Sequence, residues 1–128
     1  MLARFVLVCF AGACGTGLRY LVGVWAGEKF GPGFPLGTLL VNLAGCFLIA
    51  LILHVALNRA DFSPELRVIL TTGFVGGLTT YSSFNYETTK LLQTGATTMA
   101  ITYLALTLFG CFVMGVGGLL VAQRIVGQ

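Results

Sequence analysis

Long runs without a charged side chain dominate this sequence, and they cover residues 30–58, 68–86 and 91–123. A helix needs about 20 apolar residues to cross the hydrocarbon core of a bilayer, and the first and last of these runs are longer than that. A fourth apolar stretch, residues 5–26, is long enough as well but contains Arg19. The middle run is marginal and needs flanking residues to complete a crossing. This pattern predicts an integral membrane protein.

Composition excludes the main alternatives. Charged residues make up 9% of the chain and hydrophobic residues 57%, whereas about a quarter of the residues in an average soluble domain are charged. So few charges cannot cover the surface of a small soluble domain, and so many apolar residues exclude a disordered chain. The net charge of +3 comes from scattered basic residues, which form no patch for a nucleic acid.

We expect a single all-α membrane domain, residues 1–128, with four transmembrane helices. Glycines and prolines mark the link between the first two helices. Pro64 suits the first turn of the third helix, and Gly95 marks the link between the third and fourth helices. The N-terminal stretch resembles a signal peptide only weakly, because a second apolar segment follows it at once and no soluble mature domain remains; we expect a retained helix. The helices are expected at about 3–26, 36–57, 64–94 and 97–124.

The third of these helices is unusual, because glycines and hydroxyl residues crowd its centre, residues 72–84. Small residues such as Gly73 and Gly77 can serve tight helix packing, which explains the glycines but leaves the hydroxyl run unexplained. In lipid, a break in a helix survives only inside protein or beside a water-filled path. We therefore expect a break near residues 76–80 that lines a polar path.

Polar residues inside the other spans are candidates for the same path, since each costs free energy in lipid. Arg19 either extends to the interface or attracts anions at the mouth of the path. Thr38 and Asn42 share one helix face, where they either bond to a neighbouring helix or donate to a permeating anion. A weakly polar stripe on the last helix consists of Tyr103, Thr107 and Cys111.

Chemistry that is missing from the sequence narrows the function further. No carboxylate occupies the interior of a span, since Glu87 lies beyond the expected break, and there is no nucleophile–base set or nucleotide loop. An enzyme is not expected, and a path with donors but no fixed negative charge favours an anion. Without any C-x-x-C pair, the cysteines are interpreted as small packing residues: Cys9, Cys14, Cys46 and Cys111.

Three motifs together resemble the Fluc/CrcB fluoride channel family. They are Gly15-x-x-x-Arg19, Gly37-Thr38-Leu39-x-x-Asn42 and Thr72-Gly73-Phe74-x-Gly76-Gly77-x-Thr79-Thr80-x-Ser82-x-Phe84. The third motif is the specific one, and the resemblance covers nearly the whole chain. It implies passive export of fluoride, giving fluoride resistance, across the inner (cytoplasmic) membrane. It also implies a dual-topology homodimer, in which two antiparallel subunits enclose two pores.

The resemblance implies roles for individual residues as well. A structural Na⁺ at the dimer centre would be held by the backbone carbonyls of Gly76 and Thr79. The fluoride path would pass Asn42 and the two aromatic positions, Tyr81 and Phe84, with Arg19 near a vestibule. The remaining path residues would be Ser82, Ser83, the stripe Tyr103, Thr107 and Cys111, and, near the exit, Thr38 and Glu87.

Departures from the family and the distribution of charge complete the expectations. Tyr81 stands where the family usually has Phe, Ser83 where it usually has Thr, and Cys111 where Ser is common. Four basic residues are expected on the membrane side of the termini, and two, or three with Arg19, on the other side. This difference is small enough to allow insertion in both orientations. The alternatives are a small multidrug-type cation antiporter, which would need a carboxylate where Arg19 stands, and a structural subunit of a larger membrane complex.

Overall fold

The computed structural model of the protein describes residues 1–127, and the elements in this part of the chain are all helical. Three of them are long: α1 (Leu2–Phe30), α2 (Leu36–Asn58) and α6 (Thr97–Val126). The remaining helical segment is divided into α3 (Pro64–Val68), the π-helix η1 (Ile69–Val75), α4 (Gly76–Leu78) and α5 (Tyr81–Gln93).

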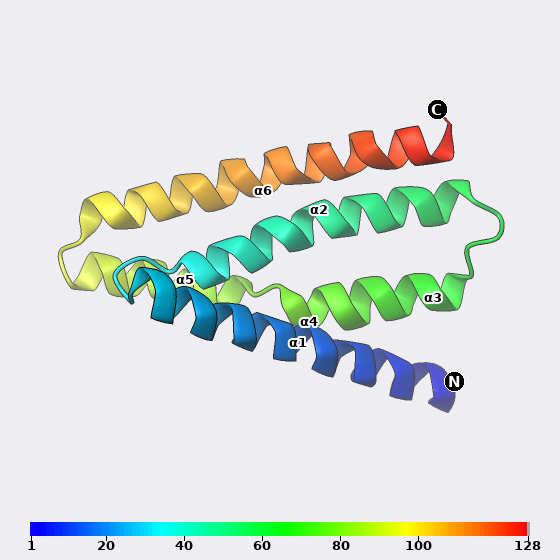
Figure 1. The fold of residues 1–128 in the computed structure, drawn as a ribbon, viewed down its shortest axis with the longest axis horizontal. Coiled ribbons are helices and arrows are strands. Elements are labelled where there is room, and N and C mark those ends of the chain that lie inside the picture. Colours follow the sequence, from blue (N-terminus) through cyan, green and yellow to red (C-terminus); the bar gives the residue numbers. More distant parts are fainter. Residues whose placement is uncertain (128) are drawn as a thin grey trace.

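The chain passes back and forth along one axis (Figure 1). Both termini and the link between α2 and α3 lie at one end, and the other two links lie at the opposite end. The helices α1, α2 and α6 are each long and apolar enough to cross a membrane. The divided segment runs between the same two ends. The helices α2 and α6 therefore run parallel to each other and opposite to the divided segment. The protein is therefore a membrane protein with several apolar helices, while a count of four crossings stays a prediction.

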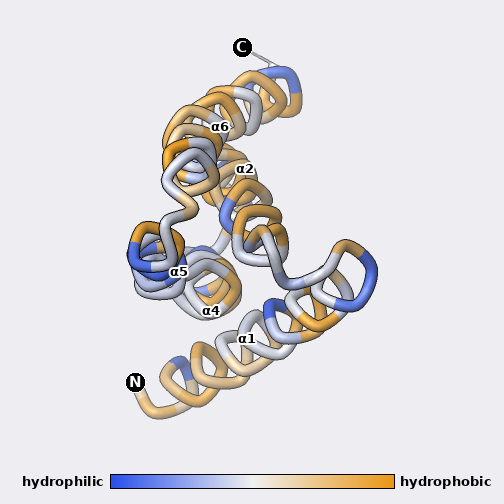
Figure 2. The backbone as a smooth tube through the Cα atoms, turned by 90° about the vertical axis from the view of Figure 1, so that its left-hand side faces the viewer, coloured by the Kyte–Doolittle hydropathy of each residue, from blue (hydrophilic) through white to orange (hydrophobic). Residues whose placement is uncertain are grey.

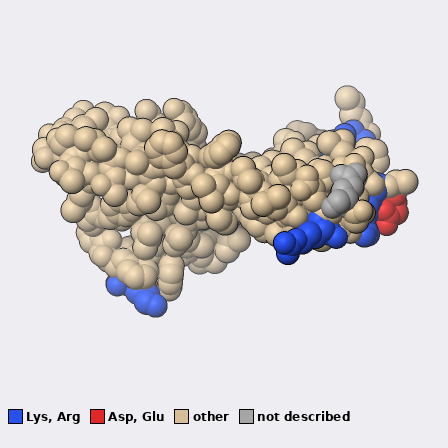
Figure 3. All heavy atoms as spheres, turned by 90° about the horizontal axis from the view of Figure 1, so that it is seen from above, with Lys and Arg blue, Asp and Glu red and all other residues tan. Residues whose placement is uncertain are grey.

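The outer surface agrees with this placement. Apolar residues cover most of the helices, and hydrophilic segments are short (Figure 2). On the face seen in Figure 3, the charged side chains lie toward the two ends of the molecule and leave an uncharged middle. Large apolar side chains such as Phe109 and Phe112 are 73% and 72% exposed, and lipid rather than water is the solvent that tolerates them.

The first helix is longer than the sequence indicated, because it ends at Phe30 rather than near residue 26. Gly31 follows with a φ of 80°, a conformation that glycine adopts without steric cost. Glu28 and Lys29 therefore belong to the last turn instead of the link. The Lys29 ammonium lies 5.5 Å from the centre of the Trp25 ring, and charges at this depth can reach the interface without leaving the helix.

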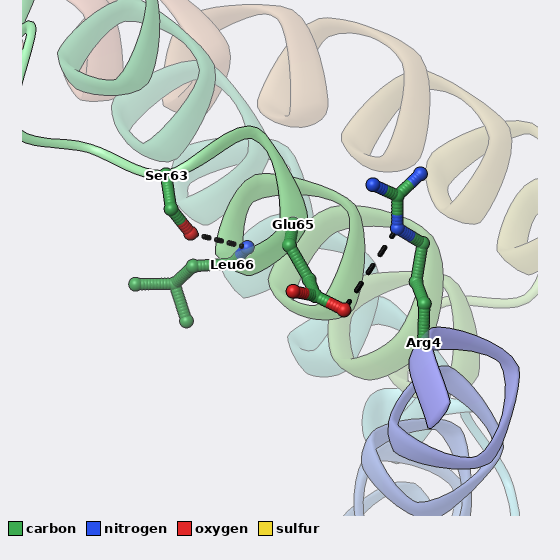
Figure 4. A network of polar contacts seen from close by, with 4 residues as sticks. All are labelled: Arg4, Ser63, Glu65 and Leu66. Atoms are coloured by element: carbon green, nitrogen blue, oxygen red, sulfur yellow. Dashed lines mark hydrogen bonds and ion pairs between the residues drawn. The ribbon is translucent and has the colours of Figure 1, made fainter. Parts of the chain in front are cut away.

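The start of the divided segment is fixed by a helix cap. The Ser63 hydroxyl accepts a hydrogen bond from the Leu66 amide at 3.0 Å, and Pro64 occupies the first turn. Nearby, the guanidinium of Arg4 lies 3.9 Å from the Glu65 carboxylate (Figure 4). Both side chains of this ion pair are about half exposed, so it contributes little stability. The cap rather than the ion pair defines where α3 begins.

Glycines let the helices approach closely, as the small-residue patterns indicated. A Cβ on Gly15 of α1 would collide with the Phe74 carbonyl oxygen of η1, and one on Gly118 of α6 would collide with the Phe47 carbonyl oxygen of α2. Without side chains at these points, backbone packs against backbone. The close approach keeps the α1–η1 and α2–α6 pairs together where lipid supplies no hydrophobic drive between helices.

The divided segment loses its helical geometry at two residues. After α4, Thr79 has φ −87° and ψ 157°, and Thr80 has φ −154° and ψ 113°, both extended. The interruption lies inside the range 76–80 that the sequence indicated. It follows a π-helix, a rare element that often occurs at functional sites, and the Gly76 amide at its end bonds to the Thr71 carbonyl.

Candidate functional site

The extended residues are held in place by an asparagine from another helix. The Asn42 amide nitrogen Nδ2 donates to the Thr80 carbonyl at 3.1 Å, and Asn42 Oδ1 accepts from the Thr80 amide at 2.8 Å. Asn42 and Thr80 are 6% and 9% exposed, so the two bonds satisfy backbone groups that water cannot reach. Asn42 thus supports the break as well as facing the cavity described below.

The hydroxyl residues of the motif cap the second half of the divided segment. Thr80 Oγ1 accepts from the Ser83 amide at 3.2 Å, which caps the N-terminus of α5. The same hydroxyl donates to the Ser83 hydroxyl at 3.0 Å and lies 3.2 Å from that of Ser82. This N-terminus carries a partial positive charge from the helix dipole. The hydroxyl run therefore has a local structural role and also orients donors around the break.

The first helix contacts the break through its one internal charge. Arg19 Nε donates to the Gly77 carbonyl at 3.1 Å, and Thr16 Oγ1 donates to the same oxygen at 3.4 Å. The Arg19 side chain is held partly buried at the break, which favours a positioning role over extension to the interface. Its predicted role at a vestibule stays a prediction.

A carboxylate and two hydroxyls meet where α2, α5 and α6 converge. The Thr38 hydroxyl donates to Glu87 Oε1 at 2.8 Å, and the Tyr103 hydroxyl donates to Glu87 Oε2 at 2.7 Å. Hydrogen bonds to an ionised acceptor are roughly twice as strong as neutral ones. This Glu87 cluster, made of Thr38, Glu87 and Tyr103, places three of the predicted path residues in direct contact.

Aromatic rings extend from this cluster toward the break. The rings of Tyr103 and Phe84 meet at 5.2 Å with an interplanar angle of 66°, and those of Phe84 and Tyr81 at 5.7 Å and 59°. Ring edges carry partial positive charge, which suits an anion. Phe84 is buried at 6% exposure, whereas Tyr81 is 77% exposed. The two predicted aromatic positions are therefore neighbours, but Tyr81 lies on the outer surface of the single chain.

Two cavities bring most of the predicted site residues together. A cavity of about 420 Å³, here called the break cavity, is lined among others by Asn42, Thr79, Tyr81, Phe84, Thr107 and Cys111. A second cavity of about 660 Å³ includes Thr38, Ser83 and Glu87 in its lining. Tyr103 connects the two, since it bonds to Glu87 and packs against Phe84.

One donor at the break cavity has no hydrogen-bond partner among the described residues. The Thr107 hydroxyl is buried and unpaired, although most buried polar atoms in proteins are bonded. It lines the same cavity as the aromatic residues Tyr81 and Phe84. An unpaired donor of this kind is available to an anion inside the cavity.

The break also releases two backbone carbonyls. In a continuous helix the amides of Thr80 and Ser83 would donate to the carbonyls of Gly76 and Thr79, four residues earlier. Here they donate instead to Asn42 Oδ1 and to the Thr80 hydroxyl. Carbonyl oxygens are ligands that hard cations accept. The two carbonyls that the family resemblance assigns to Na⁺ are therefore free of their helical donors, and their chemistry fits the ion.

Thr80 is the site residue that sequence reasoning missed. It was part of the quoted motif, but its backbone bonds to Asn42 and its hydroxyl cap of α5 had no separate signal in the sequence. The sequence also carried no signal for the position of Arg19 beside the Gly77 carbonyl. Both contacts join residues 38 or more positions apart, and only the packing of the helices brings them together.

Comparison with known proteins places this geometry in context. A family model described as "CrcB-like protein, Camphor Resistance (CrcB)" matches residues 6–119. The chain is 47% identical to the fluoride-specific ion channel FluC of Anaeromyxobacter sp. (strain K) over 98% of its own length and 100% of the relative. It is 42% identical to the FluC of Sorangium cellulosum (strain So ce56), over 96% and 97% respectively.

Proposed function

The chain belongs to the CrcB family, and on that premise we propose that it is a fluoride-selective ion channel, not an enzyme, which lets fluoride leave the cytoplasm passively. Hydrogen fluoride is a weak acid that crosses lipid in its neutral form and dissociates in a less acidic cytoplasm. An inside-negative potential then drives the anion outward, with about 2.3 kcal/mol per charge for each 100 mV. The cell gains fluoride resistance without any coupled energy source.

The observation that carries this proposal is the unpaired Thr107 hydroxyl in a cavity that also contains the Asn42 amide and the Phe84 ring. A small anion that leaves water needs donors, and conduction requires that they bind it weakly enough to release it. One buried hydroxyl, one amide and an aromatic edge meet both conditions.

Glu87 lies on the same route and calls for explanation, since a carboxylate repels anions. Its two oxygens already accept bonds from Thr38 and Tyr103. A fluoride ion at this point would take over one of the hydroxyls while the carboxylate kept the other. We therefore propose that the hydroxyls of the Glu87 cluster switch their hydrogen bonds from the Glu87 carboxylate to the passing fluoride ion and back.

A second copy of the chain completes this proposal. The break cavity and the 77%-exposed Tyr81 both lie on the surface of one protomer, so an antiparallel partner would enclose them and form two pores. The weak difference in basic residues between the two ends suits insertion in both orientations. Na⁺ at the dimer centre would be held by the carbonyls of Gly76 and Thr79, where it would supply a fixed positive charge that joins the subunits. The inner membrane is the location that this role requires.

The alternative functions are less well supported. A small multidrug-type cation antiporter needs a carboxylate in its first helix, whereas the first helix of this chain carries Arg19, which bonds to a backbone carbonyl. A structural subunit of a larger complex would give no reason for the unpaired donor.

Flux from vesicles tests the proposal. The purified protein, reconstituted in liposomes under a potassium gradient with valinomycin, should release fluoride and retain chloride, as followed with ion-selective electrodes. Equal rates for the two anions would exclude a fluoride-selective channel. Uptake of a lipophilic cation driven by a proton gradient would instead support the antiporter.

A further inference from the structure

Two cysteines, Cys46 on α2 and Cys111 on α6, line the same cavity where these two helices pack together. The two helices run in parallel register: a Cβ on Gly110 would lie 2.8 Å from the side chain of Leu43, and one on Gly115 would lie 3.8 Å from the Cys46 carbonyl. Cys111 stands one turn before Gly115, on the part of α6 that lies between these two contacts with α2. The Cys111 and Cys46 side chains are close enough to interact electrostatically.

Both thiols also open onto the same space. Each lines the break cavity together with Asn42 and Thr107. Each lines, in addition, an apolar groove of about 650 Å³ further along α2 and α6. The pair is therefore accessible from a cavity and is not sealed inside helix packing. Cys9 and Cys14, by contrast, are exposed on the surface of α1.

We propose that Cys46 and Cys111 form a dithiol site that binds one soft, two-coordinate metal ion and thereby blocks the ion path. Thiolate ligands select soft ions of the Cu⁺, Ag⁺ and Hg²⁺ type. Two ligands on facing helices suit linear coordination, and no group of three or more His, Cys, Asp or Glu among the described residues would offer a tetrahedral site. The blocking part of this inference depends on the proposed channel function, whereas the binding part does not.

The balance of charge favours a divalent ion at this depth. Mercuric chloride enters lipid as a neutral molecule. Binding forms two sulfur–mercury bonds, breaks two mercury–chlorine bonds, and releases two protons and two chloride ions. The product is neutral, so it carries no charge that the low-dielectric interior would penalise.

Mass spectrometry of the intact chain tests binding independently of transport. In a Cys9→Ser/Cys14→Ser background, which leaves only the proposed pair, mercuric chloride should add one mercury per chain without chloride. A further Cys46→Ser or Cys111→Ser change leaves one thiol, which should carry mercury with one chloride still attached. A competing monothiol should remove this mercury at a far lower concentration than it needs for the parent background. Two mercury–chloride adducts per chain in the parent background would overturn the dithiol site.

Flux tests the position of the site. Measured against each variant's own untreated rate, mercuric chloride should lower fluoride release about tenfold or more in the parent background, because the bound ion occupies a narrow path. Dithiothreitol should restore the rate. Variants with one thiol should keep most of their flux at the same concentration. Unchanged flux after complete mercury binding would overturn the block.

The two proposals fail in distinguishable ways. If the untreated protein released no fluoride, the channel function would be wrong, and the mass of the mercury adduct would still decide whether the dithiol site exists.

Discussion

At the scale of single residues, some polar side chains both stabilise the helix break and line the break cavity, whereas another only lines the cavity. Asn42 holds the break through two bonds to Thr80 and also lines the break cavity. The Thr80 hydroxyl caps α5. The Thr107 hydroxyl, in contrast, has no hydrogen-bond partner among the described residues, so the fold does not require it.

Replacing Asn42 with Asp tests the electrostatics of the cavity. The carboxylate can still accept from the Thr80 amide but loses the donor to the Thr80 carbonyl. A fixed negative charge beside the path should nearly abolish fluoride flux by repulsion, while the protein still assembles. Asn85→Asp on the exposed face of α5 is the matched control and should conduct normally. Normal flux through Asn42→Asp would mean that this side chain does not face the path.

Replacing Thr107 with Val separates function from stability. A buried hydroxyl without a partner costs about 1–3 kcal/mol, so the nearly isosteric Val should raise the free energy of unfolding by about 1 kcal/mol and lower fluoride flux. Chemical denaturation in detergent and the liposome assay measure the two effects. The control Thr98→Val changes an exposed residue and should alter neither. Loss of stability in Thr107→Val would show that the hydroxyl has a bonding partner.

Tyr81→Phe tests one of the three positions at which the chain is expected to depart from its family. The phenol adds a donor and bulk beside the path, and tight binding slows conduction. We expect the change to raise the fluoride rate and leave chloride excluded, whereas Phe84→Leu should lower the rate by removing a buried aromatic edge. A rate that falls in Tyr81→Phe would mean that the hydroxyl assists transport.

At the scale of helices, close backbone contacts set the arrangement. Gly15 touches η1 and α4 at the very place where Arg19 and Thr16 reach the Gly77 carbonyl. The α1 helix therefore acts as a support for the break and not only as a membrane anchor.

Gly15→Ala tests this support against a control in the same helix. The added methyl would collide with the Phe74 carbonyl oxygen and lie 2.9 Å from the Leu78 amide nitrogen, so we expect destabilisation of about 1–3 kcal/mol and reduced flux. Gly17 has open space at its Cβ position, and Gly17→Ala should leave flux unchanged and gain up to about 1 kcal/mol from helix propensity. Thermal unfolding in detergent compares the two; equal stability would mean that α1 can move away from the break.

At the scale of the whole molecule, the proposed dimer accounts for features that a single chain leaves open. Gly76 is exposed, and a Cβ there would meet only the Thr71 carbonyl oxygen at an ordinary 3.6 Å. Within one protomer, a side chain at this position is therefore tolerated.

Gly76→Val consequently reports on the partner and on Na⁺. We expect helical content to be retained and the dimer to weaken, because the side chain would crowd the carbonyls proposed to hold the ion. Size-exclusion chromatography at falling protein concentration, with Na⁺ or with N-methylglucamine, measures the effect. A dimer that is equally stable in both salts would argue against a structural cation.

Sequence alone predicted the membrane class, the approximate helix ranges and a break near residues 76–80. These follow from local properties: the length of charge-free runs and the glycines and hydroxyls inside one of them. The family resemblance, now supported by the match over residues 6–119, also came from local motifs. The end of α1 was placed too early, because charged residues in a last helical turn can reach the interface without ending the helix.

The contacts of the site depended on tertiary structure. The bonds from Asn42 to Thr80, from Arg19 to Gly77, and from Thr38 and Tyr103 to Glu87 join different helices. Helical periodicity says which residues share a face, but not how far two helices slide or rotate against each other. Here that register is set by backbone contacts at glycines, and it brings polar residues from different helices into contact.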